Sequence, residues 1–236
     1  MTVQSIDARR RPEPEAIDLD VVYEDDWLIA IDKPSGMVVH PTYRNWSGTL
    51  LNGLLWRVRD RPGVQPSIIT RLDKDTSGLV LVALTPEVHA RVQRDGADGR
   101  MKKEYLAFVC GTPSPPTGAI ALPLARSKED RRLVVVTETG QVSETRYEVL
   151  SSEAGRSLVR CELVTGRTHQ IRVHLAARGW PILGDRTYGK PHDTLTRQAL
   201  HAWRLRVPHP ATTKELEIEA PLPPDLQPFL PQNRTL

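Results

Sequence analysis

The feature that most constrains the fold is an uninterrupted apolar run at residues 79–84, preceded directly by a polar loop at residues 71–78. Six residues without a charge, ended by a Thr-Pro pair, predict a buried strand. The loop therefore lies at the end of a rigid element. There Asp73 can be held ionised beside Arg71, an arrangement that an enzyme needs and a structural loop does not.

Strand and helix signals follow one another irregularly along the rest of the chain. Short apolar stretches between turn residues predict strands, and Thr residues in capping positions predict helices. Because no regular βαβ period appears, we expect an α+β fold with a mixed, mostly antiparallel central sheet and flanking helices. The expected strands cover residues 27–32, 37–39, 105–109, 132–136, 142–150 and 157–164, and the expected helices follow Thr49, Thr85 and Thr168.

The domain organisation is predicted to be simple. Residues 1–17 are polar and indicate a flexible N-terminal tail, and residues 18–236 contain no Gly/Ser linker or internal repeat. We therefore expect one catalytic domain over residues 18–236. No apolar run approaches the roughly 18–20 residues of a membrane span, and the N-terminus lacks the apolar segment of a signal peptide. Cys110 and Cys161 lack CxxC spacing, so buried free thiols and a cytoplasmic location are expected.

The charge of the chain permits a polyanionic partner without requiring one. The net charge is +3 and the isoelectric point is near 9.0. A solvated face is the usual interpretation of a basic run, but such a run can also neutralise nucleic-acid phosphates. Only 5% of the residues are aromatic, which argues against a stacking platform for single strands. The basic run consists of Arg91, Arg94, Arg100, Lys102 and Lys103.

Asp73 is the first candidate for chemistry. Arg71 and Lys74 lie within two positions and favour its carboxylate form, while Asp75 adds a like charge. The Asp73/Asp75 pair resembles a DxD metal site, but hard cations usually require more oxygen ligands than this stretch offers. An ion-paired structural loop is the alternative that local sequence alone favours.

Residues 165–174 form a second constellation of polar and basic side chains. Arg167 stands at a predicted helix start, where the helix dipole opposes a cation, so it is expected to serve a carboxylate or a phosphate elsewhere. His169 and His174 are five positions apart and would not share a helix face as zinc ligands at spacing four do. Structural histidines with satisfied hydrogen bonds are the favoured interpretation.

Residues 184–190 match the first seven positions of the phosphate-binding GxxxxGK loop. The next residue is Pro191, which has neither a hydroxyl for a magnesium ion nor a backbone N–H. Nucleotide hydrolysis is therefore excluded.

Taken together, these segments resemble the RluA-type pseudouridine synthases over residues 20–223. One position departs from the pattern: Thr70 stands where many members have histidine. Because the catalytic domain is expected to start near residue 18, the N-terminal accessory RNA-binding domain that several members carry is not expected. The matching motifs are 32–36 (DKPSG), 71–73 (RLD) with 76–78 (TSG), Lys103 with Tyr105, 165–174 (TGRTHQIRVH), 184–189 (GDRTYG), 200–202 (LHA) and 209–210 (HP).

The resemblance implies a catalytic cleft and the isomerisation of a uridine within RNA, without cofactor or metal. The N1–C1′ bond breaks, the uracil turns, and C5 joins C1′. Asp73 would attack the ribose or remove a ribose proton, and Arg167 would keep Asp73 ionised through a two-pronged contact. Tyr105 would stack on the uracil, although without the resemblance a core aromatic is the favoured interpretation. Arg71 would replace the flipped base or grip its phosphate. The other residues expected to contact RNA are Thr76, Lys103, His169 and Arg172.

The expected partner is ribosomal RNA, transfer RNA or both, bound by a monomer, and neither DNA nor a membrane is expected to bind. Two rival functions share features with this prediction. An N-glycosidic hydrolase would use the same carboxylate but release free uracil. A non-catalytic RNA-binding or folding factor would not depend on Asp73 at all.

Overall fold

A ten-stranded sheet runs through the whole protein in the computed structural model, which describes residues 11–42 and 45–231. A separate two-stranded hairpin consists of β7 (Leu124–Arg126) and β8 (Val134–Val136). The strands of the large sheet are β1 (Val21–Glu24), β2 (Leu28–Lys33), β3 (Ser67–Ile68), β4 (Ser77–Ala83), β5 (Lys102–Cys110), β6 (Thr117–Ile120), β9 (Thr145–Glu153), β10 (Arg156–Leu163), β11 (Leu200–Pro208) and β12 (Glu215–Glu219).

The order of the paired strands is β1-β2-β4-β11-β5-β10-β9-β6, with β12 beside β11 and β3 beside β4. In the described part of the sheet, β4 and β11 pair in parallel and the other neighbours pair antiparallel. This confirms the predicted α+β class with a mixed, mostly antiparallel sheet.

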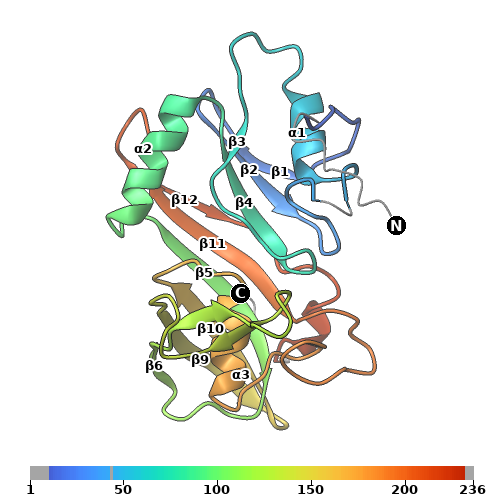
Figure 1. Cartoon of the computed structure of the whole chain (residues 1–236), viewed down its shortest axis with the longest axis vertical. Coiled ribbons are helices and arrows are strands. Elements are labelled where there is room, and N and C mark those ends of the chain that lie inside the picture. Colours follow the sequence, from blue (N-terminus) through green and yellow to red (C-terminus); the bar gives the residue numbers. More distant parts are fainter. Residues whose placement is uncertain (1–10, 43–44, 232–236) are drawn as a thin grey trace.

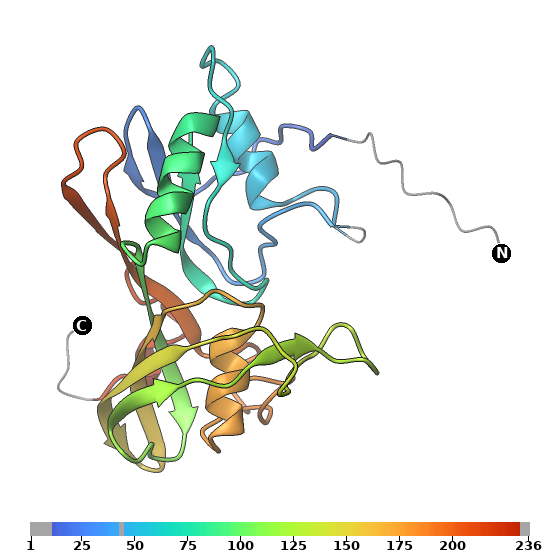
Figure 2. The same cartoon turned by 60° about the vertical axis from the view of Figure 1, so that its left-hand side comes forward.

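The sheet divides the molecule into two lobes (Figure 1). The first lobe contains β1 to β4 with helices α1 (Leu50–Arg57) and α2 (Pro86–Ala97). The second lobe contains β5, β6, β9 and β10 with α3 (Gln170–Ala177), and β11 runs from one lobe to the other. The β7–β8 hairpin projects from the second lobe (Figure 2). A short 3₁₀ helix, Gln227–Phe229, follows near the C-terminus.

The apolar run at residues 79–84 is buried because helices cover both faces of β4. On one face Val80 and Val82 pack with Leu50 and Leu54 of α1. On the other face Leu79, Leu81 and Ala83 pack with residues of α2 and β11. Every residue of β4 is buried, as predicted. A strand covered on both faces needs apolar side chains at every position instead of the alternation of a half-exposed strand.

Two of the three predicted helix starts are confirmed. The Thr49 side chain accepts a hydrogen bond from the Asn52 backbone N–H at the start of α1, and Thr85 does the same for Val88 at the start of α2. The predicted cap at Thr168 is wrong. Helix α3 begins at Gln170 with His169 as N-cap, and the His169 side chain makes no capping bond. The Gln170 side chain instead accepts from the backbone N–H of Arg167 at 3.0 Å.

Three further expectations differ from the structure. Residues 37–39 form no strand, because the Val38 and Val39 carbonyls accept the first backbone N–H groups of α1. The strand expected at 132–136 pairs with β7 outside the large sheet. Residues 13–17, expected in a flexible tail, hydrogen-bond to α1 through Glu13 and Glu15. Residues 1–10 of that tail lie outside the described residues.

Cys161 is buried and Cys110 is half-buried, and neither forms a disulfide. Burial raises the pKa of the Cys161 thiol to about 12. None of the helices in residues 11–42 and 45–231 has the length and apolar character needed to cross a lipid bilayer.

The two lobes meet where β4 pairs with β11, and this pairing requires a glycine. Gly78 has a φ of +109°, and a Cβ placed on it would lie 2.2 Å from the backbone oxygen of Ala202 in β11. No side chain fits between two backbones at that distance. Gly78 therefore allows the parallel contact that connects the loop of Asp73 to the centre of the sheet.

A buried histidine supports the same junction. His201 has no exposed surface, its Nε2 lies 3.2 Å from the Ala220 carbonyl oxygen, and its Nδ1 lies 3.0 Å from the Ser77 hydroxyl. The carbonyl can only accept, so Nε2 donates to it and Nδ1 accepts the Ser77 O–H. Burial lowers the pKa of His201 to about 4. The imidazole is therefore a neutral structural bridge between β4, β11 and the end of β12.

Replacing Gly78 by alanine is expected to lower the free energy of unfolding by at least about 2 kcal/mol, because the new Cβ collides with β11 and the backbone conformation is strained. Denaturant unfolding measures this loss. Gly96→Ala, in the last turn of α2 where a Cβ meets only a Met101 side chain at 3.7 Å, is the matched control and is expected to be neutral or stabilising. Equal stability of the two variants would contradict the proposed close contact.

His201 is expected to make stability depend on pH. Its folded pKa, about 4, lies below the ordinary value of 6.5, so the unfolded chain binds the proton more readily in that interval. The resulting stability is fully present above pH 6.5 and is lost as pH falls towards 4, by roughly 3 kcal/mol in total. Urea unfolding of the parent and of His201→Gln at several pH values measures the difference between them. That difference should shrink on acidification, and a constant difference would disprove the assignment.

Candidate active site

Asp73 lies in the loop before β4, and a buried lysine fixes the backbone of that loop. Lys33 has no exposed surface, and its ammonium donates to the carbonyls of Pro34, Met37 and Lys74 at 2.8–2.9 Å. Burial lowers the pKa of Lys33 to about 8. Three carbonyls around one ammonium tie the turn after β2 to the residue that follows Asp73.

The same loop is held from the side of β11. The buried Arg197 forms a two-pronged ion pair with Asp225 and directs Nη1 to the Asp75 carbonyl at 3.4 Å. Gln198 donates to the Thr76 hydroxyl at 3.1 Å. Thr76 is 2% exposed, so the structure argues against the expected RNA contact at this residue and gives it a structural position instead.

Arg172 is the side chain that holds the Asp73 carboxylate. Its Nη1 donates to Asp73 Oδ2 at 2.9 Å, while Nε and Nη2 donate to the two oxygens of Asp185 at 2.7 and 3.0 Å. Burial by itself lowers the pKa of Arg172, but Asp185 and Asp73 raise it above its usual value. Burial likewise opposes ionisation of Asp185, yet hydrogen bonds from Arg172 hold its pKa below the usual range. One guanidinium therefore links two carboxylates.

The expected contact between Arg167 and Asp73 is wrong. Arg167 is exposed, its Nε donates to the Val142 carbonyl, and its backbone N–H binds Gln170. Arg172 stands five positions further along, inside α3, where residues 170–175 are all buried, and its Nη1 reaches the acid. The expected RNA contact of Arg172 is also unsupported, because this residue is 7% exposed and its guanidinium is paired with the carboxylates of Asp73 and Asp185.

His169 lies near the same carboxylate oxygen of Asp73 that Arg172 binds. Its Nε2 is 3.8 Å from Asp73 Oδ2, and its Nδ1 is 2.8 Å from the Tyr188 hydroxyl. Burial lowers the pKa of His169. His174, by contrast, is fully buried between Thr145 and the Leu122 carbonyl, as expected for a structural histidine.

Tyr105 lies on β5 and is 7% exposed. Burial, with a smaller contribution from the charge of Asp73, raises the pKa of its hydroxyl well above the usual value. The phenol is therefore neutral at physiological pH. Its ring belongs to the apolar core cluster that β5, β10 and α3 form.

Two of the expected RNA-contacting cations, Arg71 and Lys103, are not fully buried. Arg71 is exposed, and its charge adds to burial in lowering the pKa of His40. The half-buried Lys103 places Nζ beside Gly166, because a Cβ on that glycine would lie 3.5 Å from it. Burial lowers the pKa of Lys103. Both remain candidates for phosphate contacts.

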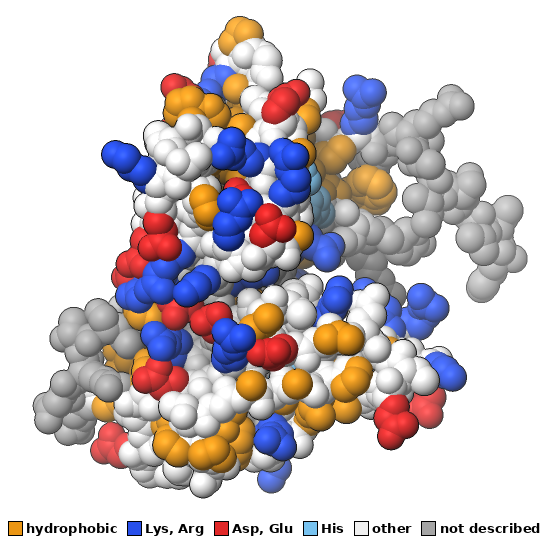
Figure 3. Space-filling view, turned by 90° about the vertical axis from the view of Figure 1, so that its left-hand side faces the viewer, with side chains coloured by type: hydrophobic (Ala, Val, Ile, Leu, Met, Phe, Trp, Pro, Cys, Tyr) orange, Lys and Arg blue, Asp and Glu red, His pale blue; other side chains and the backbone are white. Residues whose placement is uncertain are grey.

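The basic cluster near α2 faces solvent. Arg91, Arg94 and Lys102 are exposed, and Arg100 pairs with Asp95 at 2.6 Å and with Asp98 at 3.0 Å. Lys and Arg side chains lie scattered among acidic ones on the face shown in Figure 3. A mixed, solvated surface matches the more common interpretation of such a run.

Asp185 and Tyr188 are the site residues that sequence reasoning did not select. Both lie in residues 184–190, the segment considered and rejected as a phosphate-binding loop. Asp185 also accepts from the backbone N–H groups of Thr187 and Tyr188, which closes a tight turn. In the sequence, the signal for these two residues was an acid and a tyrosine between Gly184 and Gly189.

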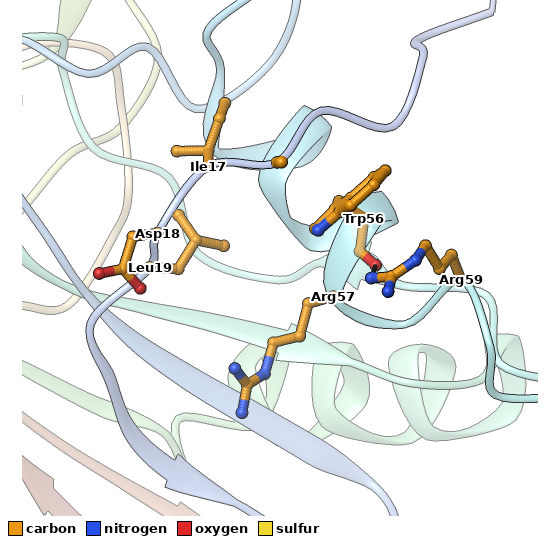
Figure 4. A pocket seen from close by; sticks show the side chains of 7 residues that line it. Ile17, Asp18, Leu19, Trp56, Arg57 and Arg59 are labelled. Carbon is orange, nitrogen blue, oxygen red and sulfur yellow. Dashed lines mark hydrogen bonds between the residues drawn. The ribbon is translucent and has the colours of Figure 1, made fainter.

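A surface cavity of about 430 Å³ lies elsewhere, between α1 and the chain before β1 (Figure 4). Ile17, Asp18, Trp56, Arg57 and Arg59 line it, and none of the residues around Asp73 does. It therefore has no part in the chemistry of this site. In the described ranges, no group of three or more His, Cys, Asp or Glu side chains is arranged to hold a metal ion.

The arrangement suits chemistry at a sugar carbon. It combines one partly exposed carboxylate, a cation that keeps it oriented, and a neutral phenol whose pKa the charge of the carboxylate helps to raise. A fixed carboxylate can act as a nucleophile or as a base.

Comparisons with known proteins point to one family. A family model described as RNA pseudouridylate synthase matches residues 27–177. The uncharacterized RNA pseudouridine synthase YlyB of Bacillus subtilis is 42% identical over 228 residues, covering 91% of this chain and 75% of that protein. Ribosomal large subunit pseudouridine synthase D of Nitrosomonas europaea is 42% identical over 234 residues, covering 95% and 68%. Among solved structures, human RNA pseudouridylate synthase domain containing 1 aligns with a TM-score of 0.72 at 29% identity, covering 92% and 86%.

Replacing Arg172 and Arg167 separately should distinguish their positions. Arg172→Gln leaves the buried carboxylate of Asp185 without its cation, so the free energy of unfolding is expected to fall by about 3 kcal/mol. Arg167→Gln removes an exposed cation and is expected to change stability by less than about 0.5 kcal/mol. Guanidinium denaturation of both variants measures the difference. A similar loss in each would show that Arg172 is not the internal partner.

Proposed function

This chain belongs to the RNA pseudouridylate synthase family, whose members isomerise uridine to pseudouridine in RNA, and we propose that its substrate is a uridine of large-subunit ribosomal RNA. The family assignment confirms the resemblance to RluA-type enzymes. The choice of RNA is supported by relatives about 40% identical to this chain that are named ribosomal large subunit pseudouridine synthase D.

The observation on which the mechanism rests is the Asp73 carboxylate, 24% exposed and bound by Arg172. A carboxylate that accepts from a guanidinium is stabilised in its ionised form, which both possible routes require. In one route an Asp73 oxygen attacks C1′ as the N1–C1′ bond breaks. In the other it removes the proton from C2′. The role first predicted for Arg167 thus passes to Arg172.

Tyr105 is proposed to receive the uracil. Its ring offers a flat face beside the carboxylate, and the protonated phenol does not repel an anionic base that has left the sugar. A phenol that holds its own proton can donate a hydrogen bond but cannot accept the C5 proton. We therefore assign Tyr105 to orienting the ring while it turns.

The uridine must leave its stack to reach this site, because C1′ is inaccessible within a helix. Arg71 and Lys103 are proposed to hold the RNA backbone near the site. The projecting β7–β8 hairpin adds the exposed cations Arg126, Lys128 and Arg131 on the second lobe (Figure 2). Contacts of this kind supply affinity without selecting a sequence.

Replacing Asp73 by asparagine tests the catalytic assignment. The variant keeps the size of the side chain and loses the charge, so pseudouridine formation is expected to fall by at least about 10³-fold. Ribosomal RNA transcripts and transfer RNA from cells that lack the protein are incubated with parent and variant. Modified sites are then mapped by carbodiimide labelling and primer extension. Asp75→Asn, in the same loop, is the matched control and should retain most of the activity.

Each outcome of this assay separates the candidates. Pseudouridine in transfer RNA alone would reject the ribosomal substrate and keep the reaction. Free uracil with an abasic site would indicate N-glycosidic hydrolysis. Undiminished product from Asp73→Asn would reject Asp73 as the reactive group.

A further inference from the structure

A line of hydrogen-bonding groups leads from the β7–β8 hairpin to Asp73. The backbone N–H of Val134 in β8 donates to the Tyr188 hydroxyl at 2.8 Å. That hydroxyl lies 2.8 Å from His169 Nδ1, and His169 Nε2 lies 3.8 Å from Asp73 Oδ2. The four groups come from three distant parts of the sequence.

The chemistry of the two ends sets the direction of the line. An ionised carboxylate only accepts, so the imidazole nitrogen that faces Asp73 must present its hydrogen. Burial lowers the pKa of His169, and the neutral ring then holds its single hydrogen on Nε2. Nδ1 is left as an acceptor for the Tyr188 O–H, and a lone pair of Tyr188 receives the Val134 N–H. All the hydrogens thus point from the hairpin towards the acid.

The backbone at His169 indicates that this placement matters. His169 has a φ of +54°, in the left-handed region that residues other than glycine rarely occupy. It is the N-cap of α3, but its side chain makes no capping bond. The backbone of His169 is therefore strained, and its side chain does not cap α3, while its ring lies between Tyr188 and Asp73.

Tyr188 is itself fixed by the group that holds Arg172. Its backbone N–H donates to Asp185 Oδ1 at 3.1 Å, and the Arg172 guanidinium lies over its ring at 5.0 Å. Its ring also packs against a small cluster formed by Leu124 and Val134 of the hairpin with Val173 of α3. Two supports of Asp73, the guanidinium and the imidazole, thus depend on the same turn.

We propose that His169 and Tyr188 are positioning residues. Tyr188 orients the His169 ring so that its Nε2–H faces the Asp73 carboxylate, and the orientation of this carboxylate therefore depends on how the β7–β8 hairpin packs against Tyr188. This inference rests on the proposed function, in which Asp73 is the reactive group. The 3.8 Å between His169 Nε2 and Asp73 Oδ2 is too long for a hydrogen bond. If the two side chains approach each other by less than about 1 Å, the N–H can donate to the carboxylate. RNA that binds the hairpin would favour that approach.

The kinetic test compares Tyr188→Phe and His169→Asn with the parent on the same RNA. Asparagine tolerates the left-handed backbone but cannot reach Asp73, so it removes the N–H without adding strain. In both variants kcat is expected to fall about 10- to 100-fold while KM changes less than about twofold. Tyr147→Phe is the matched control, because Tyr147 is 5% exposed and donates to the Pro115 carbonyl away from the site.

A change in KM with unchanged kcat would overturn the positioning role. The double variant provides a second criterion. If the two residues act in series, its kcat should equal that of the more damaged single variant, whereas a multiplied loss would show independent roles.

The spectroscopic test does not depend on activity. In protein labelled with ¹⁵N-histidine, the His169 resonances, assigned by their loss in His169→Asn, should show a protonated Nε2 and an unprotonated Nδ1. Tyr188→Phe should raise the population of the opposite tautomer. A protonated Nδ1 in the parent would overturn the inference even if the enzyme is active. A parent with the expected tautomer that makes no pseudouridine would instead reject the proposed function alone.

Discussion

The backbone contact between β4 and β11 at Gly78 is the constraint on which the rest of the structure depends. It joins two lobes through one parallel pairing within an otherwise antiparallel sheet. The contact is possible because Gly78 has no side chain to separate it from Ala202. The loop of Asp73 leads into β4, which pairs with β11, and β11 also pairs with β5, the strand that carries Tyr105. The pairing therefore brings together the strands of the two side chains proposed to be reactive, although these strands belong to different lobes.

Electrostatics then fixes the carboxylate within that site. Arg172 is buried between Asp73 and Asp185, so two carboxylates compensate its charge, and removing the arginine would leave Asp185 as a buried acid without its cation. Lys33 and Arg197 hold the backbone directly after the acid by binding the carbonyls of Lys74 and Asp75. A carboxylate supported in this way keeps its direction when the substrate arrives, which reduces the reorganisation that the reaction requires.

The site also combines rigid and responsive parts. The first lobe presents Asp73 on a loop with internal bonds, whereas the second lobe contributes Arg172, His169 and Tyr188 around a single turn. The β7–β8 hairpin packs on that turn and displays exposed cations. In the proposed mechanism, substrate affinity and the geometry of the acid are connected through the same small group of contacts.

The sequence by itself determined the elements whose evidence is local. The buried strand at 79–84, the caps at Thr49 and Thr85, the α+β class and the candidacy of Asp73 follow from patterns within a few residues, and the order of motifs identified the family. Only the tertiary structure decided which arginine meets Asp73. Arg167 and Arg172 stand five positions apart, and the choice depends on where α3 begins, because Arg167 lies before the helix and is exposed whereas Arg172 lies inside it and is buried. The tertiary structure likewise decided the roles of Asp185 and Tyr188. Their segment stood out in the sequence as an acid and a tyrosine between two glycines, but their contacts with Arg172 and His169 follow from packing over a long sequence separation.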